Sequence, residues 1–154
     1  MAEPSFKGFA EIVDAIQHAR TGTGFIAMID IYPIVALDRM PSERGLRACA
    51  TEVYRAWDKT SVVAGVTPSK VRRWRTALIE HVSENPFNYL SEVQCAQAAR
   101  LGGRLAELIE TEMGAIRMVA TVDYRPHDWY AAQWEDWLLV AAGRATVLHL
   151  GWDS

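Results

Sequence analysis

Apolar side chains recur at intervals of three and four residues in four stretches of the chain, which is the spacing of an amphipathic helix. The helices expected from this spacing span about residues 6–20, 42–57, 68–84 and 91–113. Ser42 is the expected N-cap of the second helix, because a serine hydroxyl accepts a hydrogen bond from the first helical turn.

The fourth of these helices has clear signals at both ends and an interruption between them. Ser91 and Gln94 have the spacing of a capping box at its start, and Gly114 ends it. Gly102 and Gly103 each cost about 1 kcal/mol relative to alanine in a helix, so the pair indicates a kink, a break or a close contact with another helix.

Three segments have the pattern of strands. Residues 25–32 are rich in β-forming residues, and residues 115–124 alternate between apolar and polar side chains. Residues 136–152 are expected to form two strands around a tight turn, where Gly143 supplies a positive φ. The element order α-β-α-α-α-β-β-β predicts an α+β fold in a single domain, residues 1–154. We expect a small, mostly antiparallel sheet of about four strands, with about four helices on one face.

The composition is that of a chain that folds. Half of the residues are apolar and 23% are charged. The longest apolar runs, at 25–29 and 137–142, are far shorter than the roughly 20 residues needed to cross a bilayer, and no signal-peptide pattern opens the sequence. Cys49 and Cys95 stand alone in helical patterns, as in proteins of a reducing compartment. These features predict a cytoplasmic protein that does not span a membrane.

The sequence contains no motif of a known catalytic, metal or cofactor site. Its four histidines lack the spacing of zinc ligands, and no nucleophile signature is present. We therefore expect no cofactor, no metal and no catalytic residue. One alternative is a small enzyme whose site the fold assembles from scattered side chains. The candidates for such a site are His127, Asp128, His149, Asp153, Asp30 and Asp38.

The middle of the chain is basic, although the whole chain has a net charge of −3. Residues 39–75 carry nine basic and three acidic side chains. This excess of positive charge suggests either an anionic partner or pairing with acidic faces of the same molecule. With Gly65 at an expected turn, and Thr67 and Pro68 as the start of a helix, residues 58–78 resemble the helix-turn-helix of bacterial and phage regulators. The resemblance implies a DNA-binding regulator as an alternative function. Its recognition helix would present Ser69, Lys70, Arg72, Arg73 and Arg75 to DNA.

The C-terminal segment is rich in tryptophan. Its last 26 residues hold four of the six tryptophans, Trp129, Trp134, Trp137 and Trp152. Tryptophan supplies a large contact area at protein interfaces, and the acidic residues around these side chains suit a basic partner. The expected partner-binding residues are Trp129, Trp134, Trp152, Asp128, Glu135 and Asp136.

The first hypothesis is therefore a non-catalytic binding protein that docks a macromolecule, most simply another protein. Small acidic α+β proteins with a tryptophan-rich hairpin and no active site resemble the immunity proteins that neutralise bacterial toxins. The resemblance implies that acidic and aromatic side chains cover the active cleft of a basic toxin, as a steric and electrostatic block.

Overall fold

A long β-hairpin near the C-terminus forms the centre of the sheet. In the computed structural model, residues 6–22, 26–125 and 133–153 are described. Strands β5 (Gln133–Ala141) and β6 (Arg144–Asp153) pair antiparallel from Gln133 opposite Trp152 to Ala141 opposite Arg144. Gly143 turns the chain between them with a φ of 73°, a value that favours glycine. The predicted hairpin is confirmed.

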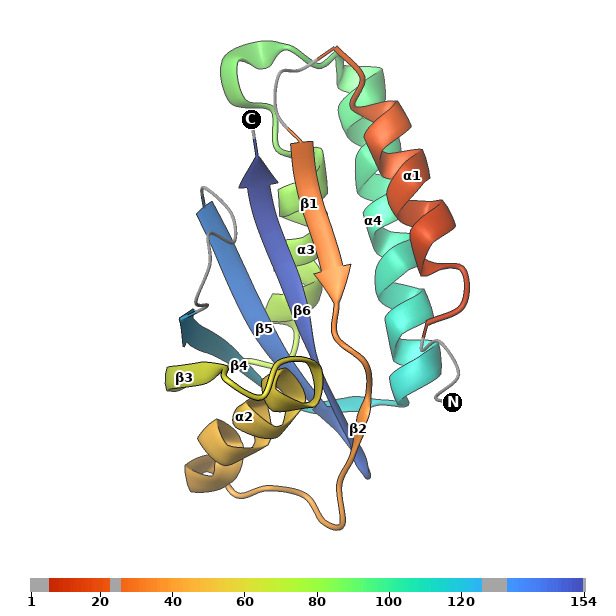
Figure 1. Ribbon diagram of the computed structural model, residues 1–154. Helices are drawn as coiled ribbons and strands as arrows, with labels where there is room; N and C mark the ends of the chain where they lie inside the picture. Colours follow the sequence, from red (N-terminus) through yellow and green to blue (C-terminus); the bar gives the residue numbers. More distant parts are fainter. Residues whose placement is uncertain (1–5, 23–25, 126–132, 154) are drawn as a thin grey trace.

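The hairpin lies inside a six-stranded antiparallel sheet with the strand order β1-β6-β5-β4-β3 (Figure 1). A short strand, β2, also pairs with β6. The bounds of the other strands are β1 (Ile26–Ile31), β2 (Val35–Ala36), β3 (Val62–Ser69) and β4 (Ile116–Arg125). The α+β class is confirmed, and the sheet has six strands where about four were expected.

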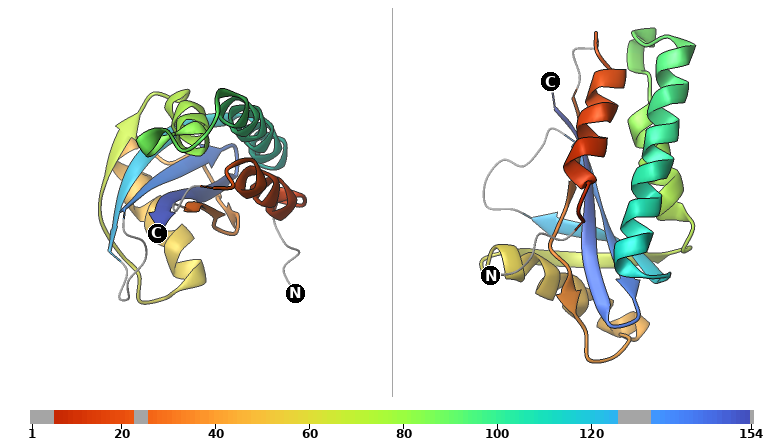
Figure 2. Two further views of the ribbon diagram at one scale, coloured as in Figure 1. Left: turned by 90° about the horizontal axis from the view of Figure 1, so that it is seen from above. Right: turned by 90° about the vertical axis from the view of Figure 1, so that its right-hand side faces the viewer.

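Helices cover both faces of this sheet. Three of them, α1 (Phe9–Ala19), α3 (Arg73–Ser83) and α4 (Glu92–Met113), lie on one face, and α2 (Leu46–Trp57) lies on the other (Figures 1 and 2). Two short 3₁₀ turns, η1 (Glu43–Gly45) and η2 (Pro86–Asn88), precede α2 and α4. The prediction that all helices lie on one face is wrong. No helix in the described part of the chain is both long and apolar enough to cross a membrane.

Two apolar cores follow from this arrangement. Trp74 and Leu78 of α3 pack on the three-helix face with Leu139 and Leu148 of the central hairpin. On the α2 face, Ala50 and Val53 of α2, together with Leu138 and Val147 of the hairpin, belong to the second core. Consecutive residues of β5 thus enter opposite cores, which is why this strand reads as a continuous apolar run rather than an alternating one.

Residues 58–78 do not form a helix-turn-helix. Residues 62–69 are the edge strand β3, whose Thr67 lies opposite Thr121 of β4. The β-branched residues of this segment favour a strand, and Pro68 is tolerated there because an edge strand leaves backbone groups without a ladder partner. Helix α3 begins only at Arg73, so the helix-turn-helix prediction and its recognition helix are wrong.

The glycine pair in α4 marks a close helix contact rather than a break. Helix α4 runs without interruption over 22 residues. A Cβ atom added at Gly102 would lie 2.6 Å from Cγ2 of Val82 and 3.4 Å from Cα of Ile79, both in α3. A Cβ at Gly103 would meet nothing within 4 Å. Gly102 therefore sets the distance between α3 and α4.

These two neighbouring glycines give a matched pair of variants. Gly102→Ala should lower the free energy of unfolding by about 1–3 kcal/mol, because the added methyl group overpacks the α3–α4 contact. Gly103→Ala should raise it by roughly 0.5–1 kcal/mol, because alanine is the better helix former. Urea denaturation of both variants tests this, and equal shifts in the two would contradict the assigned contact.

Candidate functional site

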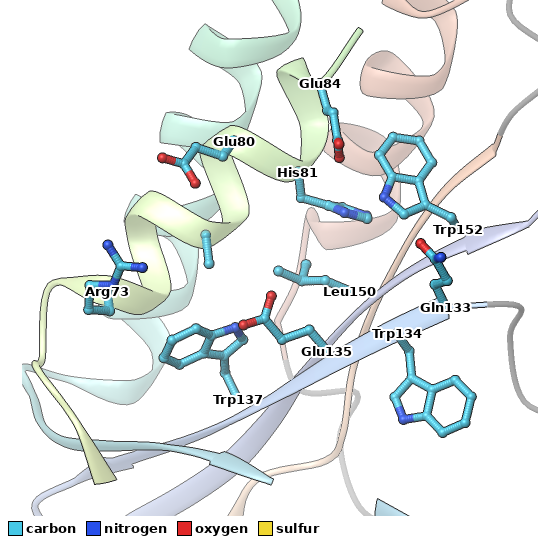
Figure 3. A pocket seen from close by; sticks show the side chains of 11 residues that line it. Arg73, Glu80, His81, Glu84, Gln133, Trp134, Glu135, Trp137, Leu150 and Trp152 are labelled. Atoms are coloured by element: carbon cyan, nitrogen blue, oxygen red, sulfur yellow. The ribbon is translucent and has the colours of Figure 1, made fainter. Parts of the chain in front are cut away.

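A cavity of about 510 Å³ opens between α3 and the ends of β5 and β6 (Figure 3). This size is within the range of small ligand pockets. Helix α3 forms one wall with side chains one helical turn apart, and the central hairpin forms the other. The lining residues are Arg73, Ala77, Glu80, His81, Glu84, Gln133, Trp134, Glu135, Trp137, Leu150 and Trp152.

The rim of the cavity is acidic. Glu80 of α3, Glu84 directly after α3 and Glu135 of β5 are exposed, and none of the three forms a salt bridge within the described part of the chain. Partial burial raises the pKa of the Glu135 carboxyl, and the negative charge of Glu80 raises it further. The positive charge of Arg73, which also lies at the rim, lowers the pKa of Glu135. Arg73 is nevertheless not within ion-pair distance of Glu135. The rim therefore carries carboxylates whose charge is not neutralised by contact.

The floor of the cavity is aromatic. Trp137 is 3% exposed, and its indole N–H makes no hydrogen bond among the described residues. This N–H lies beside the Glu135 carboxylate, where it lowers the pKa of that group without reaching hydrogen-bonding geometry (Figure 3). Trp152 is half-buried and contacts the His81 ring, with 4.6 Å between the ring centroids. Indole surfaces beside carboxylates form a site suited to a cation.

His81 is held neutral inside this wall. Its Nε2 lies 3.1 Å from the Met28 carbonyl oxygen, and burial lowers the pKa of the imidazole to about 4, with the nearby charge of Arg20 acting in the same direction. The Arg20 guanidinium lies 5.0 Å from the centroid of Trp152 and donates to the carbonyl oxygens of Val82 and Glu84. These contacts fix the C-terminal end of α3 against β6, and so they fix the mouth of the cavity.

A second group of polar side chains is buried on the α2 face of the sheet. The two oxygens of the Asp136 carboxylate lie 2.5 Å from the Tyr54 hydroxyl and 2.6 Å from Nδ1 of His149. All three residues are at most 1% exposed. The Tyr54 ring stacks on Tyr124 at 4.0 Å. This group ties α2 to both strands of the hairpin, and its burial suits a structural role rather than contact with a partner.

The sequence candidates for partner binding are divided between the two faces. Glu135 and Trp152 line the cavity, whereas Asp136 is buried on the α2 face and is not part of an accessible rim. Trp134 is 40% exposed and also borders the cavity at the edge of β5, but its indole is turned away from Trp137 (Figure 3). Asp128 and Trp129 lie outside the described residues.

The sequence reasoning missed the α3 side of the site. Ala77, Glu80 and Glu84 recur at three- and four-residue spacing, which is the signal of a single helix face. That signal shows a shared face, but only the tertiary structure shows that the face lies opposite the hairpin.

The basic residues assigned to a recognition helix are dispersed. Ser69 ends β3, and Lys70 and Arg72 precede α3. Arg73 lies at the rim of the cavity, and Arg75 is ion-paired with Glu110 of α4 at 2.7 Å.

The candidates for a scattered enzyme site do not line the cavity where they are described. Asp30 of β1 lies opposite His149 of β6, but the Asp30 side chain is exposed and His149 is buried. Asp38 lies in the connection between β2 and η1. His127 and Asp128 are outside the described residues, as is the side chain of Asp153. Within the described residues, no group of three or more His, Cys, Asp or Glu side chains is placed to hold a metal ion.

Comparison of the chain with protein-family models, curated proteins and solved structures finds no significant match. The functional argument therefore depends on the geometry of the site.

The buried His81 predicts a pH dependence of stability. The unfolded chain binds a proton at this histidine below a pKa near 6.5, whereas the folded chain does so only near 4, so the stability that a neutral His81 supports is lost as the pH falls through this window. The free energy of unfolding should fall by about 2 kcal/mol between pH 7 and pH 5 from this group. The free energy of unfolding of His81→Gln, measured by urea denaturation at both pH values, should lack this decrease between pH 7 and pH 5. The matched control His18→Gln, at an exposed histidine, should show the same decrease as the wild type. A decrease in His81→Gln as large as that of the wild type would contradict the role assigned to His81.

Proposed function

We propose that this chain is a non-catalytic binding protein that docks a basic protein partner at the cavity between α3 and the β5–β6 hairpin. The observation that supports this proposal best is the pairing of an acidic rim with a tryptophan floor. Glu80, Glu84 and Glu135 form the rim, and Trp137 and Trp152 form the aromatic surface below it.

Charge complementarity supports a basic partner. The carboxylates at the rim are exposed, so they attract a positively charged surface before contact and increase the rate of association. His81 adds no positive charge at neutral pH, because its pKa is lowered to about 4. Arg73 is the one cation among the described lining residues, against three carboxylates.

The aromatic floor supplies the anchor that a protein interface needs. Binding free energy concentrates in a few side chains that fill well-packed pockets, and a polar rim excludes water around them. A partner side chain that enters this cavity would contact Trp137 and Trp152 and would pass between the rim carboxylates. This arrangement suits a protein that blocks the basic active cleft of its partner, which is the mode of action of the immunity proteins that the sequence resembles in type.

The cavity predicts which substitutions weaken partner binding. The double variant Glu80→Gln/Glu84→Gln should weaken binding of the purified partner at least tenfold, because it removes two negative charges at the rim without a change of shape. The matched control, Glu52→Gln/Glu107→Gln, removes two exposed carboxylates on α2 and α4 and should bind as the wild type does. Partners are captured from extract on immobilised wild-type protein and then purified. Their affinity for the wild type and for each of the two double variants is measured by calorimetry at two salt concentrations.

The two double variants distinguish the outcomes. Capture of a basic protein whose affinity falls only in the Glu80/Glu84 variant, and falls further with salt, supports the proposal. Equal affinity for the wild type and both variants, or a captured partner that is acidic, would overturn it.

A further inference from the structure

Exposed apolar side chains gather in the connection between α3 and α4, at the end of the molecule where β6 ends (Figure 1). Phe87, Tyr89 and Val93 are 71%, 58% and 74% exposed, and the rings of Phe87 and Tyr89 lie 5.9 Å apart between centroids. We call these three side chains the apolar patch. They lie within seven residues of each other, whereas exposed apolar side chains on an ordinary surface are scattered, so the patch indicates a contact site.

The loop that carries the patch is held in one conformation. The Asn85 side chain donates to the Leu90 carbonyl oxygen at 2.9 Å and accepts from the Leu90 N–H at 2.8 Å. The Leu90 side chain is buried, and the capping box of Ser91 and Gln94 fixes the start of α4. Gln94 also donates to the Thr21 carbonyl oxygen at 3.2 Å. The patch is therefore preformed, which lowers the entropic cost of binding a partner.

The residue at the tip of this loop is not the one that its backbone favours. Phe87 has a φ of 64° and Asn88 a φ of 57°, both in the left-handed region. Asparagine tolerates this region, whereas a bulky aromatic residue is disfavoured there. Phe87 belongs to neither of the two apolar cores. A side chain that opposes the local backbone preference and adds nothing to a core is typical of a functional position.

The charges around the apolar patch favour a basic partner. Glu84 directly before the loop and Glu92 directly after it are exposed, and positions 85–91 hold no charged residue. Arg20 attracts Glu84 but is itself buried, so a partner meets the carboxylates rather than the guanidinium. A symmetric dimer through the patch would bring the carboxylates of two copies together, and an anionic lipid surface would be repelled. A basic protein surface is attracted instead.

We propose that the apolar patch is a second contact with the basic protein partner. The rings of Phe87 and Tyr89, together with Val93, enter an apolar recess of the partner that is bordered by lysine or arginine side chains. Glu84 lines the cavity and directly precedes the loop, so the patch continues the docking surface beyond the cavity. The identity of the partner rests on the proposed function, whereas the contact itself rests on the loop.

A peptide selection tests the chemistry of this contact without a known partner. A random peptide library displayed on phage is selected on the immobilised full chain in the presence of excess soluble Phe87→Asn variant, which removes peptides that bind elsewhere. The enriched peptides should combine apolar side chains with lysine or arginine and should lack acidic residues. Failure to enrich any peptide, or enrichment of acidic peptides, would overturn the proposal.

Single variants locate the binding of one enriched peptide, which is synthesised and measured by calorimetry. Tyr89→Ser, which plays no part in the selection, should weaken binding at least tenfold, because an aromatic anchor is lost. Glu92→Gln should weaken it several-fold, and more at low salt than at high salt. The control Trp57→Gln removes an exposed indole on α2 and should bind as the wild type does. Equal affinity for Tyr89→Ser and the wild type would overturn the assignment.

A melting curve separates a binding role of Phe87 from a structural one. Phe87→Asn should keep the wild-type melting temperature or raise it, because asparagine tolerates the left-handed backbone at this position. A lower melting temperature in this variant would assign the ring to the fold and overturn the proposal.

The same variant distinguishes the other occupants of the patch. Sedimentation of the wild type that shows a dimer, with a monomer in Phe87→Asn, would assign the patch to a second copy of the chain. Binding of the wild type but not of Phe87→Asn to phosphatidylcholine vesicles would assign it to a membrane. Either result would overturn the proposal, and we expect neither.

Failure of this inference can be distinguished from failure of the proposed function. If the purified partner binds Glu80→Gln/Glu84→Gln weakly but binds Phe87→Asn as it binds the wild type, only this inference fails. If it binds Phe87→Asn weakly but is indifferent to Glu80→Gln/Glu84→Gln, docking at the cavity fails and the contact at the loop remains. If no partner is captured, the proposed function fails, and the peptide selection alone decides this inference.

Discussion

The register of the central β-hairpin determines what every other element of this structure can contact. Side chains along β5 alternate between the two faces of the sheet, so Glu135 and Trp137 enter the three-helix face while Asp136 enters the α2 face. A slip of one residue would exchange the two sets. The cavity would then lose its indole floor and its Glu135 carboxylate, and the buried carboxylate would lose its partners.

The Asp136 group supports this register from the α2 face. A carboxylate inside an apolar core is costly unless its oxygens accept hydrogen bonds, and here one oxygen contacts the Tyr54 hydroxyl and the other contacts Nδ1 of His149. Asp136 and His149 are opposite each other in the hairpin, and Tyr54 comes from α2. The contact is therefore possible in one register and one position of the helix. Burial of these polar groups on one face holds the binding side chains in place on the other.

The position of α3 completes the site, and it depends on contacts of α3 with α4 and with Arg20. Gly102 lets α4 approach α3 closely, because any Cβ at that position would collide with Val82. Arg20 donates to the carbonyl oxygens of Val82 and Glu84 and so attaches the end of α3 to the loop after α1 and, through Trp152, to β6. Glu80 on α3 and Glu84 directly after it therefore lie over the hairpin, because the helix is fixed at its end and along its length.

Local signals in the sequence predicted the elements better than their arrangement. The capping box at Ser91 and the hairpin turn at Gly143 depend on nearby residues, and both are present in the structure. The helix predicted over 42–57 is present as the 3₁₀ turn η1, which Ser42 caps, followed by α2 (Leu46–Trp57). β3 was misassigned, because Thr67 followed by Pro68 has the pattern of a helix start as well as of an edge strand. In the site, the tryptophan-rich hairpin indicated Glu135 and Trp152, but nothing local showed that the Glu80 face of α3 would lie opposite them.

The indole N–H of Trp137 reports most directly on whether the cavity is the binding site. In a ¹⁵N–¹H correlation spectrum its resonance can be assigned from its absence in Trp137→Phe. On addition of the purified partner it should shift, because the cavity that Trp137 lines is then filled, while the N–H of Trp74, which is 1% exposed in the core below α3, stays in place. An unchanged Trp137 resonance at saturation, with a shift instead at Trp57 on the surface of α2, would place binding on the other face of the sheet and contradict the account.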